Sequence, residues 1–114
     1  MKNRTHKLFI EDMLEAMTKI ERYIKAMDYN AFSQNTLVID AVVRNLEVIG
    51  EAATNIPENI RDSYLNIPWR RMVGLRNIVI HEYFGIDLKI IWEIVSRNLP
   101  ETKPGLIAML NDLE

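Results

Sequence analysis

The scarcity of chain breakers constrains this sequence most. Its 114 residues contain only four glycines and four prolines, and long intervals without either residue are typical of helices. Pro57 and Pro68 bracket one expected connector, and Gly85 lies in another. Gly50 and Gly74 interrupt otherwise helical patterns, where a missing side chain allows two helices to approach closely. The pattern predicts a helical protein, and no stretch shows the alternation of a strand.

Apolar residues recur at helical spacing in several segments. The predicted helices span about residues 7–27, 32–55, 68–83, 87–97 and 104–113, with a short helical turn inside the connector 56–67. Either Ser33 or Asn35 is suited to cap the second helix, and Asp87 the fourth. Pro100 is expected to close that fourth helix. The sum predicts a single all-α domain over residues 1–114, an antiparallel bundle of four to five helices.

The second predicted helix is apolar over more than one face, as expected of a central helix or of one shared with a partner subunit. A chain of this length buries only roughly two thirds of the surface that it exposes when unfolded. Pairing with a second copy would add buried area, so we expect a homodimer.

The composition limits the cellular compartment and the kinds of partner that we expect for this protein. The absence of cysteine excludes disulfides and thiolate metal sites and suits a reducing cytoplasm. The charged start MKNRTHKLFIEDM is unlike a secretory signal, and no apolar run approaches the roughly 20 residues of a membrane helix. We therefore expect a cytoplasmic protein with no membrane partner.

The net charge of −2 argues against a generic RNA binder. Any RNA contact must therefore be local, or it must use positive charge that two subunits contribute to a dimer cleft.

The stretch WRRMVGLRNIVIHEYFG, residues 69–85, carries the candidate chemistry. At about 100° per residue, Asn77 and His81 share one helix face, and Arg76 and Tyr83 nearly eclipse each other two turns apart. Arg76 and His81 are about 140° apart on that geometry, so one straight helix does not make them neighbours. A shared site is still permitted in three ways. The arginine side chain is long, the end of the helix can unwind, and a two-fold partner can bring a second Arg–His set into one cleft.

An arginine with a histidine is a workable set for cutting RNA without a metal. Histidine titrates near neutral pH and can move the proton of a 2′-hydroxyl or of a leaving 5′-oxygen. Arginine can bind a phosphate and stabilise the charge that grows on it, and Asn77 could bridge or orient either group. By residue type alone, packing or salt-bridge roles for Arg76, His81 and Tyr83 are more common than catalysis.

These residues resemble a family signature. Arg76, His81 and Tyr83 fill the three fixed positions of the R-x4-H-x-Y motif of HepT-like proteins, a branch of the HEPN superfamily. Asn77 fills the polar position that commonly follows the arginine. The resemblance extends over about residues 38–99, through the second-helix segment RNLEVIGEAA and the residues Ile-Pro-Trp that lead into the motif helix.

The resemblance implies a HEPN-type bundle whose two protomers face both Arg–His sets into one cleft. It implies a metal-independent endoribonuclease without a cofactor, acting as the toxin of a type VII-like toxin–antitoxin system. Its implied partner is a MntA-like nucleotidyltransferase antitoxin that transfers AMP onto the motif tyrosine, here Tyr83. The added AMP would bring bulk and phosphate charge beside Arg76, where the RNA phosphate must lie.

Other interpretations stay open. Glu47 and Glu51 are four residues apart and could be a carboxylate pair for a metal, although no histidine accompanies them and a solvated or salt-bridged face is more common. Glu51 could instead support the site by orienting Arg76. A different function, a non-catalytic helical dimer that binds a nucleotidyltransferase or a nucleotide, suits the acidic net charge. The intact pair of Arg76 and His81 favours the enzyme.

Overall fold

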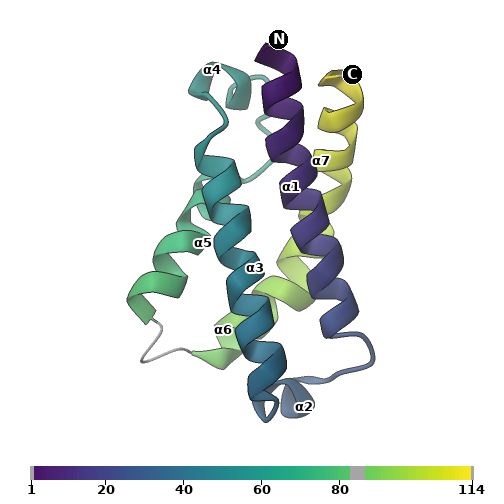
Figure 1. Ribbon diagram of the computed structural model, residues 1–114, viewed down its shortest axis with the longest axis vertical. Coiled ribbons are helices and arrows are strands. Elements are labelled where there is room, and N and C mark those ends of the chain that lie inside the picture. The colour runs from purple at the N-terminus through teal and green to yellow at the C-terminus, as the bar shows by residue number, and fades with distance from the viewer. Residues whose placement is uncertain (1, 83–86, 114) are drawn as a thin grey trace.

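The all-α prediction is confirmed. The computed structural model describes the backbone of residues 2–82 and 87–113 and the side chains of 6–77 and 87–113, and every regular element within these ranges is helical (Figure 1). The longer elements are α1 (Lys2–Tyr23), α3 (Thr36–Thr54), α5 (Trp69–Glu82) and a continuous rod of α6 (Leu88–Glu93), the π-helical turn η2 (Ile94–Asn98) and α7 (Leu99–Leu113); the short ones are α2 (Tyr29–Ser33) and α4 (Glu58–Arg61).

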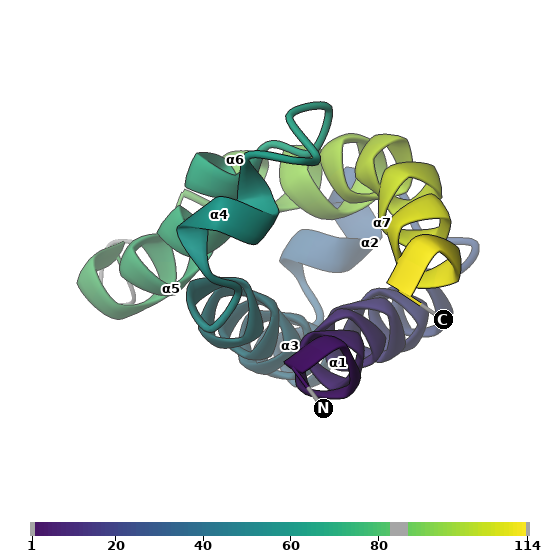
Figure 2. The ribbon, with the colours of Figure 1, turned by 90° about the horizontal axis from the view of Figure 1, so that it is seen from above.

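The four long elements run alternately up and down, so that both termini lie at the same end of the bundle (Figure 1). α3 packs closely against both α1 and α5, and α1 also packs against α7. Viewed from above, these elements form a ring in which α5 and α7 are the pair left without close backbone packing (Figure 2). The second predicted helix thus packs between two other helices of its own chain, which agrees with the first of the two alternatives; that it is also shared with a partner subunit stays a prediction. Among the helices that the structure places, none combines the length and hydropathy needed to cross a membrane.

The predicted helix over 32–55 is in fact two helices. α2 ends at Ser33, and Asn35 begins α3 by accepting a hydrogen bond from the N–H of Val38 at 3.0 Å. The Ser33 hydroxyl instead donates to the carbonyl of Asn30 at 3.0 Å, inside α2. Of the two predicted caps, Asn35 is the one that the structure confirms. Asp87 also acts as predicted, because its side chain accepts from the N–H of Lys89 at 3.0 Å.

The prediction that Pro100 closes a helix is wrong. α6, η2 and α7 follow one another without a break, so Pro100 lies in the first turn of α7 and Pro104 in its interior. The reason is the π-helical turn just before Pro100, in which the N–H of Leu99 reaches back to the carbonyl of Ile94. A proline ring collides with the carbonyl four residues earlier in a regular helix. The widened turn moves that carbonyl away and lets the helix continue.

Arg61 of α4 closes the C-terminal end of α3. Its guanidinium donates to the carbonyls of Ile56 at 2.8 Å, Ala53 at 3.0 Å and Thr54 at 3.2 Å. The last carbonyls of a helix have no partner within the helix. One side chain from the following turn satisfies them and fixes the connector between α3 and α5.

We expect Arg61→Ala to lower the free energy of unfolding by about 2 kcal/mol, since hydrogen bonds to a charged group contribute roughly 1.5–3 kcal/mol. Arg61→Lys should recover only part of the loss, because a lysine lacks the planar fork that reaches several carbonyls. Urea denaturation measures both values. Arg70→Ala, an exposed arginine of α5, is the control and should change stability by less than about 0.5 kcal/mol. An equally small effect at Arg61 would contradict the capping role.

Candidate active site

α5 crosses α3 at Gly50, directly beneath Arg76. A Cβ atom built on Gly50 would lie 2.8 Å from the backbone nitrogen of Arg76 and 3.0 Å from its Cβ. Real Cβ atoms do not approach backbone so closely, so only glycine fits here. The predicted close packing is thus confirmed at Gly50. It is wrong at Gly74, where a Cβ would meet nothing within 4 Å.

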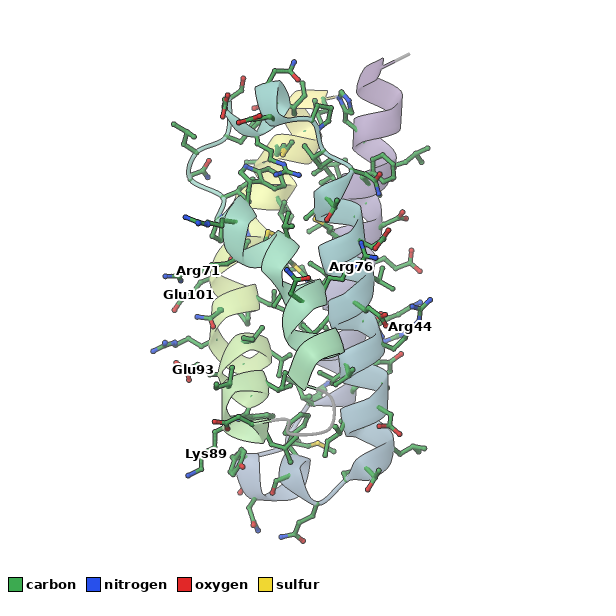
Figure 3. The ribbon with its side chains drawn as sticks, turned by 90° about the vertical axis from the view of Figure 1, so that its left-hand side faces the viewer. Arg44, Arg71, Arg76, Lys89, Glu93 and Glu101 are labelled. Atoms are coloured by element: carbon green, nitrogen blue, oxygen red, sulfur yellow. The ribbon has the colours of Figure 1, made fainter. Side chains whose placement is uncertain are left out.

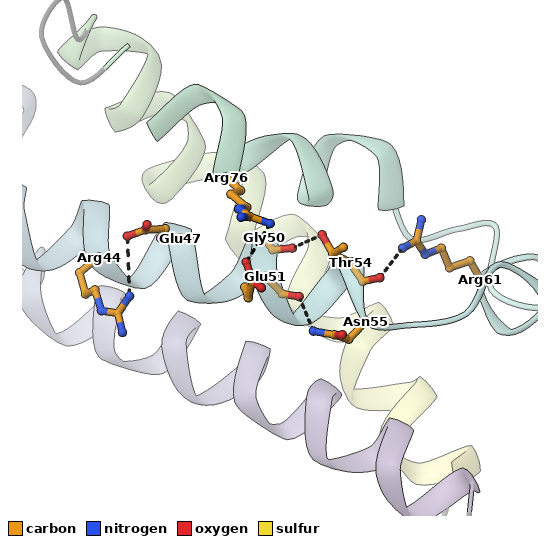
Figure 4. Close-up of polar contacts among 8 residues, drawn as sticks. All are labelled: Arg44, Glu47, Gly50, Glu51, Thr54, Asn55, Arg61 and Arg76. Carbon is orange, nitrogen blue, oxygen red and sulfur yellow. Dashed lines mark hydrogen bonds and ion pairs between the residues drawn. The ribbon is translucent and has the colours of Figure 1, made fainter. Parts of the chain in front are cut away.

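This contact places Arg76 beside Glu51, the residue that follows Gly50 in α3. The Nη1 atom of Arg76 lies 3.1 Å from Oε2 of Glu51, and both side chains are about half exposed (Figure 4). The carboxylate is the one ion-pair partner that the described part of the chain gives Arg76. A guanidinium has five N–H donors in a planar fork, so donors are left to bind a phosphate. The structure thereby brings together two of the predicted site residues.

Glu47 and Glu51, the carboxylates considered above as a metal-binding pair, each form an ion pair with a different arginine. Oε2 of Glu47 lies 3.7 Å from Nη1 of Arg44, while Glu51 faces Arg76 (Figure 4). Within residues 6–77 and 87–113, no three His, Asp or Glu side chains are grouped so that they could hold a metal ion. Glu47 and Glu51 therefore behave as a salt-bridged helix surface, the more common of the two interpretations.

The other predicted site residues are less completely described. Asn77 is exposed on α5, and its side chain has no hydrogen-bond partner among the described residues. His81 belongs by its backbone to the last turn of α5, but its side chain lies outside the described residues, as do Tyr83 and Gly85 altogether. That Arg76 and His81 share one site thus stays a prediction.

The exposed surface of α5 before Glu82 carries arginines and no acidic residue, although these arginines do not share one face of the helix. No Asp or Glu occurs between Asp62 and Glu82, although the chain as a whole carries a net charge of −2. Arg70, Arg71 and Arg76 are all exposed, and Arg71 and Arg76 project to opposite sides of α5 (Figure 3). The acid-free run was visible in the sequence. RNA binding generally requires local positive charge, and this run concentrates positive charge on one helix of an acidic chain.

Comparison with known proteins assigns the family. Residues 13–109 match the family model described as "Ribonuclease HepT-like", and the chain therefore belongs to the HepT-like ribonuclease family. The resemblance stated from the motif is confirmed at the level of the family.

Individual relatives support the same assignment. The chain is 45% identical over 103 residues to a protein of Methanocaldococcus jannaschii named "Putative RNase", covering 90% of this chain and 94% of that protein. It is 38% identical to a Thermococcus cleftensis protein named "Probable ribonuclease HepT", over 88% of this chain and 91% of the relative. It is 27% identical to the "mRNA nuclease HepT" of Shewanella oneidensis, over 78% and 89%. No solved structure gives a significant match.

Proposed function

We propose that the chain is a metal-independent endoribonuclease whose catalytic residues are Arg76 and His81, and that it acts as the toxin of a toxin–antitoxin pair. The observation that carries the proposal is the half-exposed Arg76, fixed over Gly50 and held on one side by Glu51. The exposed arginines in the acid-free run of α5 and the ribonuclease names of the relatives support it.

The chemistry follows from the two side chains. His81 accepts the proton of a ribose 2′-hydroxyl, and the 2′-oxygen forms a bond to phosphorus as the bond from phosphorus to the 5′-oxygen breaks. The proton that His81 took from the 2′-hydroxyl is then given to the leaving 5′-oxygen, which leaves a 2′,3′-cyclic phosphate and a 5′-hydroxyl. Arg76 stabilises the negative charge on the phosphate oxygens during the transfer. Glu51 positions Arg76, and Asn77 orients the histidine or the phosphate.

The test is cleavage of single-stranded RNA by the purified protein in the presence of EDTA. We expect fragments with 2′,3′-cyclic phosphate ends and an unchanged rate after chelation, because neither proposed group needs a metal. Cleavage that appears only after a divalent ion is added would contradict the mechanism. A protein that binds nucleotide but cuts no RNA would favour the alternative, a non-catalytic binding dimer, to which the net charge of −2 lends some weight.

We further propose that two copies form the active unit, with the exposed faces of both α5 helices lining one cleft. A dimer would bring Arg76 of both subunits to one surface and so raise the local positive charge there, although each chain is acidic overall. Light scattering on the active fraction should give twice the mass of the 13.3 kDa chain. Full activity in a monomeric fraction would contradict this assembly.

The proposed antitoxin is a MntA-like nucleotidyltransferase that transfers AMP from ATP to the hydroxyl of Tyr83. Tyr83 directly follows α5 and is seven positions beyond Arg76. A phosphate attached there would compete with RNA for the guanidinium. Incubation with the transferase and ATP should add the mass of AMP to the wild type and to Tyr64→Phe, but not to Tyr83→Phe, and should abolish cleavage. An AMP adduct that persists in Tyr83→Phe would refute the assignment.

A further inference from the structure

The open side of the helical ring contains a cavity that the proposed ribonuclease site does not use. It lies between α5 and the rod formed by η2 and α7, and its volume is about 550 Å³. Volumes of this order are typical of sites for small ligands. The apolar side chains of its wall are those of Pro68, Met72, Leu75, Ile94 and Leu99, and the polar ones are those of Asn66, Arg71, Asn98, Glu101 and Thr102.

Four of the polar side chains are free to bind a ligand: Asn66, Arg71 and Glu101 are exposed to solvent, and Asn98 is half-buried. Among the described residues, no hydrogen bond or ion pair involves the side chains of Asn66, Arg71, Asn98 or Glu101. Arg71 of α5 and Glu101 of α7 both line the cavity, and they project toward the same side of the molecule (Figure 3). The cavity thus offers two amides, one cation and one carboxylate around an apolar wall.

We propose that this cavity binds a purine ribonucleotide unit. A carboxamide can pair with the edge of adenine by donating and accepting at once, which suits Asn66 and Asn98. Arg71 would bind the phosphate through charge-assisted hydrogen bonds. The carboxylate of Glu101 would accept from the ribose hydroxyls, as acidic residues do in dinucleotide sites. The apolar wall would cover the faces of the base.

The backbone around the cavity supports a binding role. Ile94 and Asn98 are the two ends of η2, and π-helical turns occur frequently at functional sites. Across the cavity, a Cβ on Gly105 would lie 3.1 Å from Nδ2 of Asn66. Because Gly105 has no side chain, α7 approaches the connector before α5 without covering that amide.

The cavity and the ribonuclease site lie on different sides of α5, since Arg71 and Arg76 project in opposite directions (Figure 3). The ribonucleotide has two possible sources. It is either a free nucleotide or an unpaired residue of an RNA strand that crosses α5. The RNA source rests on the proposed ribonuclease function, whereas the free nucleotide does not, so the two proposals can fail separately.

Calorimetric titration with AMP tests the site directly. We expect Arg71→Ala to weaken AMP binding about tenfold or more, because it removes a charge-assisted pair. Arg70→Ala removes the same charge from the neighbouring position outside the cavity and should change the affinity by less than about twofold. Gly74→Leu should abolish binding while the protein stays folded, because Gly74 lines the cavity and a Cβ there meets no atom within 4 Å. Thermal unfolding verifies the fold of each variant.

Cleavage of a short adenine-rich oligoribonucleotide distinguishes the sources. If AMP competes with the oligonucleotide and Arg71→Ala raises KM with kcat unchanged, the occupant is a residue of the RNA. If AMP binds but cleavage is the same in the wild type and Arg71→Ala, or if no RNA is cut, the occupant is a free nucleotide. The proposal is overturned if AMP does not bind the wild type, if Arg70→Ala and Arg71→Ala weaken binding equally, or if Gly74→Leu binds AMP as the wild type does.

Discussion

Replacing Arg76 by alanine is expected to lower kcat/KM for RNA cleavage by about 10²–10³-fold, the usual cost of removing one donor to the charge of a transition state. Most of the loss should fall on kcat, because the negative charge that the guanidinium stabilises develops fully only as the phosphate reacts. Single-turnover kinetics on a defined oligoribonucleotide would separate this loss from weaker binding.

Arg70→Ala is the matched control for this prediction. Arg70 and Arg76 are both exposed arginines of α5, so either change lowers the net charge by one unit on the same helix. Arg70→Ala should reduce kcat/KM by less than about threefold at moderate salt, through the loss of one distant phosphate contact. Glu51→Gln should give a smaller loss than Arg76→Ala, because it removes only the ion pair that positions Arg76. Equal losses for Arg70 and Arg76 would show that only bulk charge matters.

The second large effect is expected at Gly50. Gly50→Ala should lower the free energy of unfolding by about 1–3 kcal/mol, the range for forcing extra atoms into a packed contact. The added methyl group would collide with the backbone nitrogen of Arg76, so α5 must move away from α3. That movement also displaces Arg76 from Glu51, and displacements of about 1 Å near reacting groups can cost about 10² in rate. Urea denaturation and the cleavage assay measure the two consequences.

Gly74→Ala provides the control, because Gly74 is also a helical glycine but faces open space. It should stabilise the protein by about 0.5–1 kcal/mol, since alanine is the better helix former. The two variants therefore move stability in opposite directions for the same change in sequence. A stabilising Gly50→Ala would mean that α3 and α5 do not meet where the structure places them.

Features that depend on neighbouring residues were predictable from the sequence. Asn35 and Asp87 cap helices because each side chain bonds a backbone N–H two or three residues away. The packing of α3 against two other helices was one of the two alternatives that its wide apolar surface left open. Features that depend on distant contacts were harder to predict. Gly50 and Gly74 look alike in the sequence, and only the position of α5 distinguishes them.

The errors and omissions have two origins, an irregular helical turn and contacts between distant segments. The stop expected at Pro100 is relieved by the π-helical turn before it, which no local propensity predicts. The candidate site was found through its motif, but the contact between Glu51 and Arg76 joins two helices and was proposed without any geometry to support it. The cavity beside Arg71 was missed entirely, because its walls come from segments well apart in the sequence.

The most direct test of the central claim is a double-mutant cycle on RNA cleavage with Arg76→Ala, His81→Ala and the variant that carries both changes. Groups that act together on one phosphate lose most of their effect once either is removed. We therefore predict that the double variant cleaves RNA about as slowly as the slower single variant. Rate losses that multiply would show that the arginine and the imidazole act independently, and would contradict a shared active site.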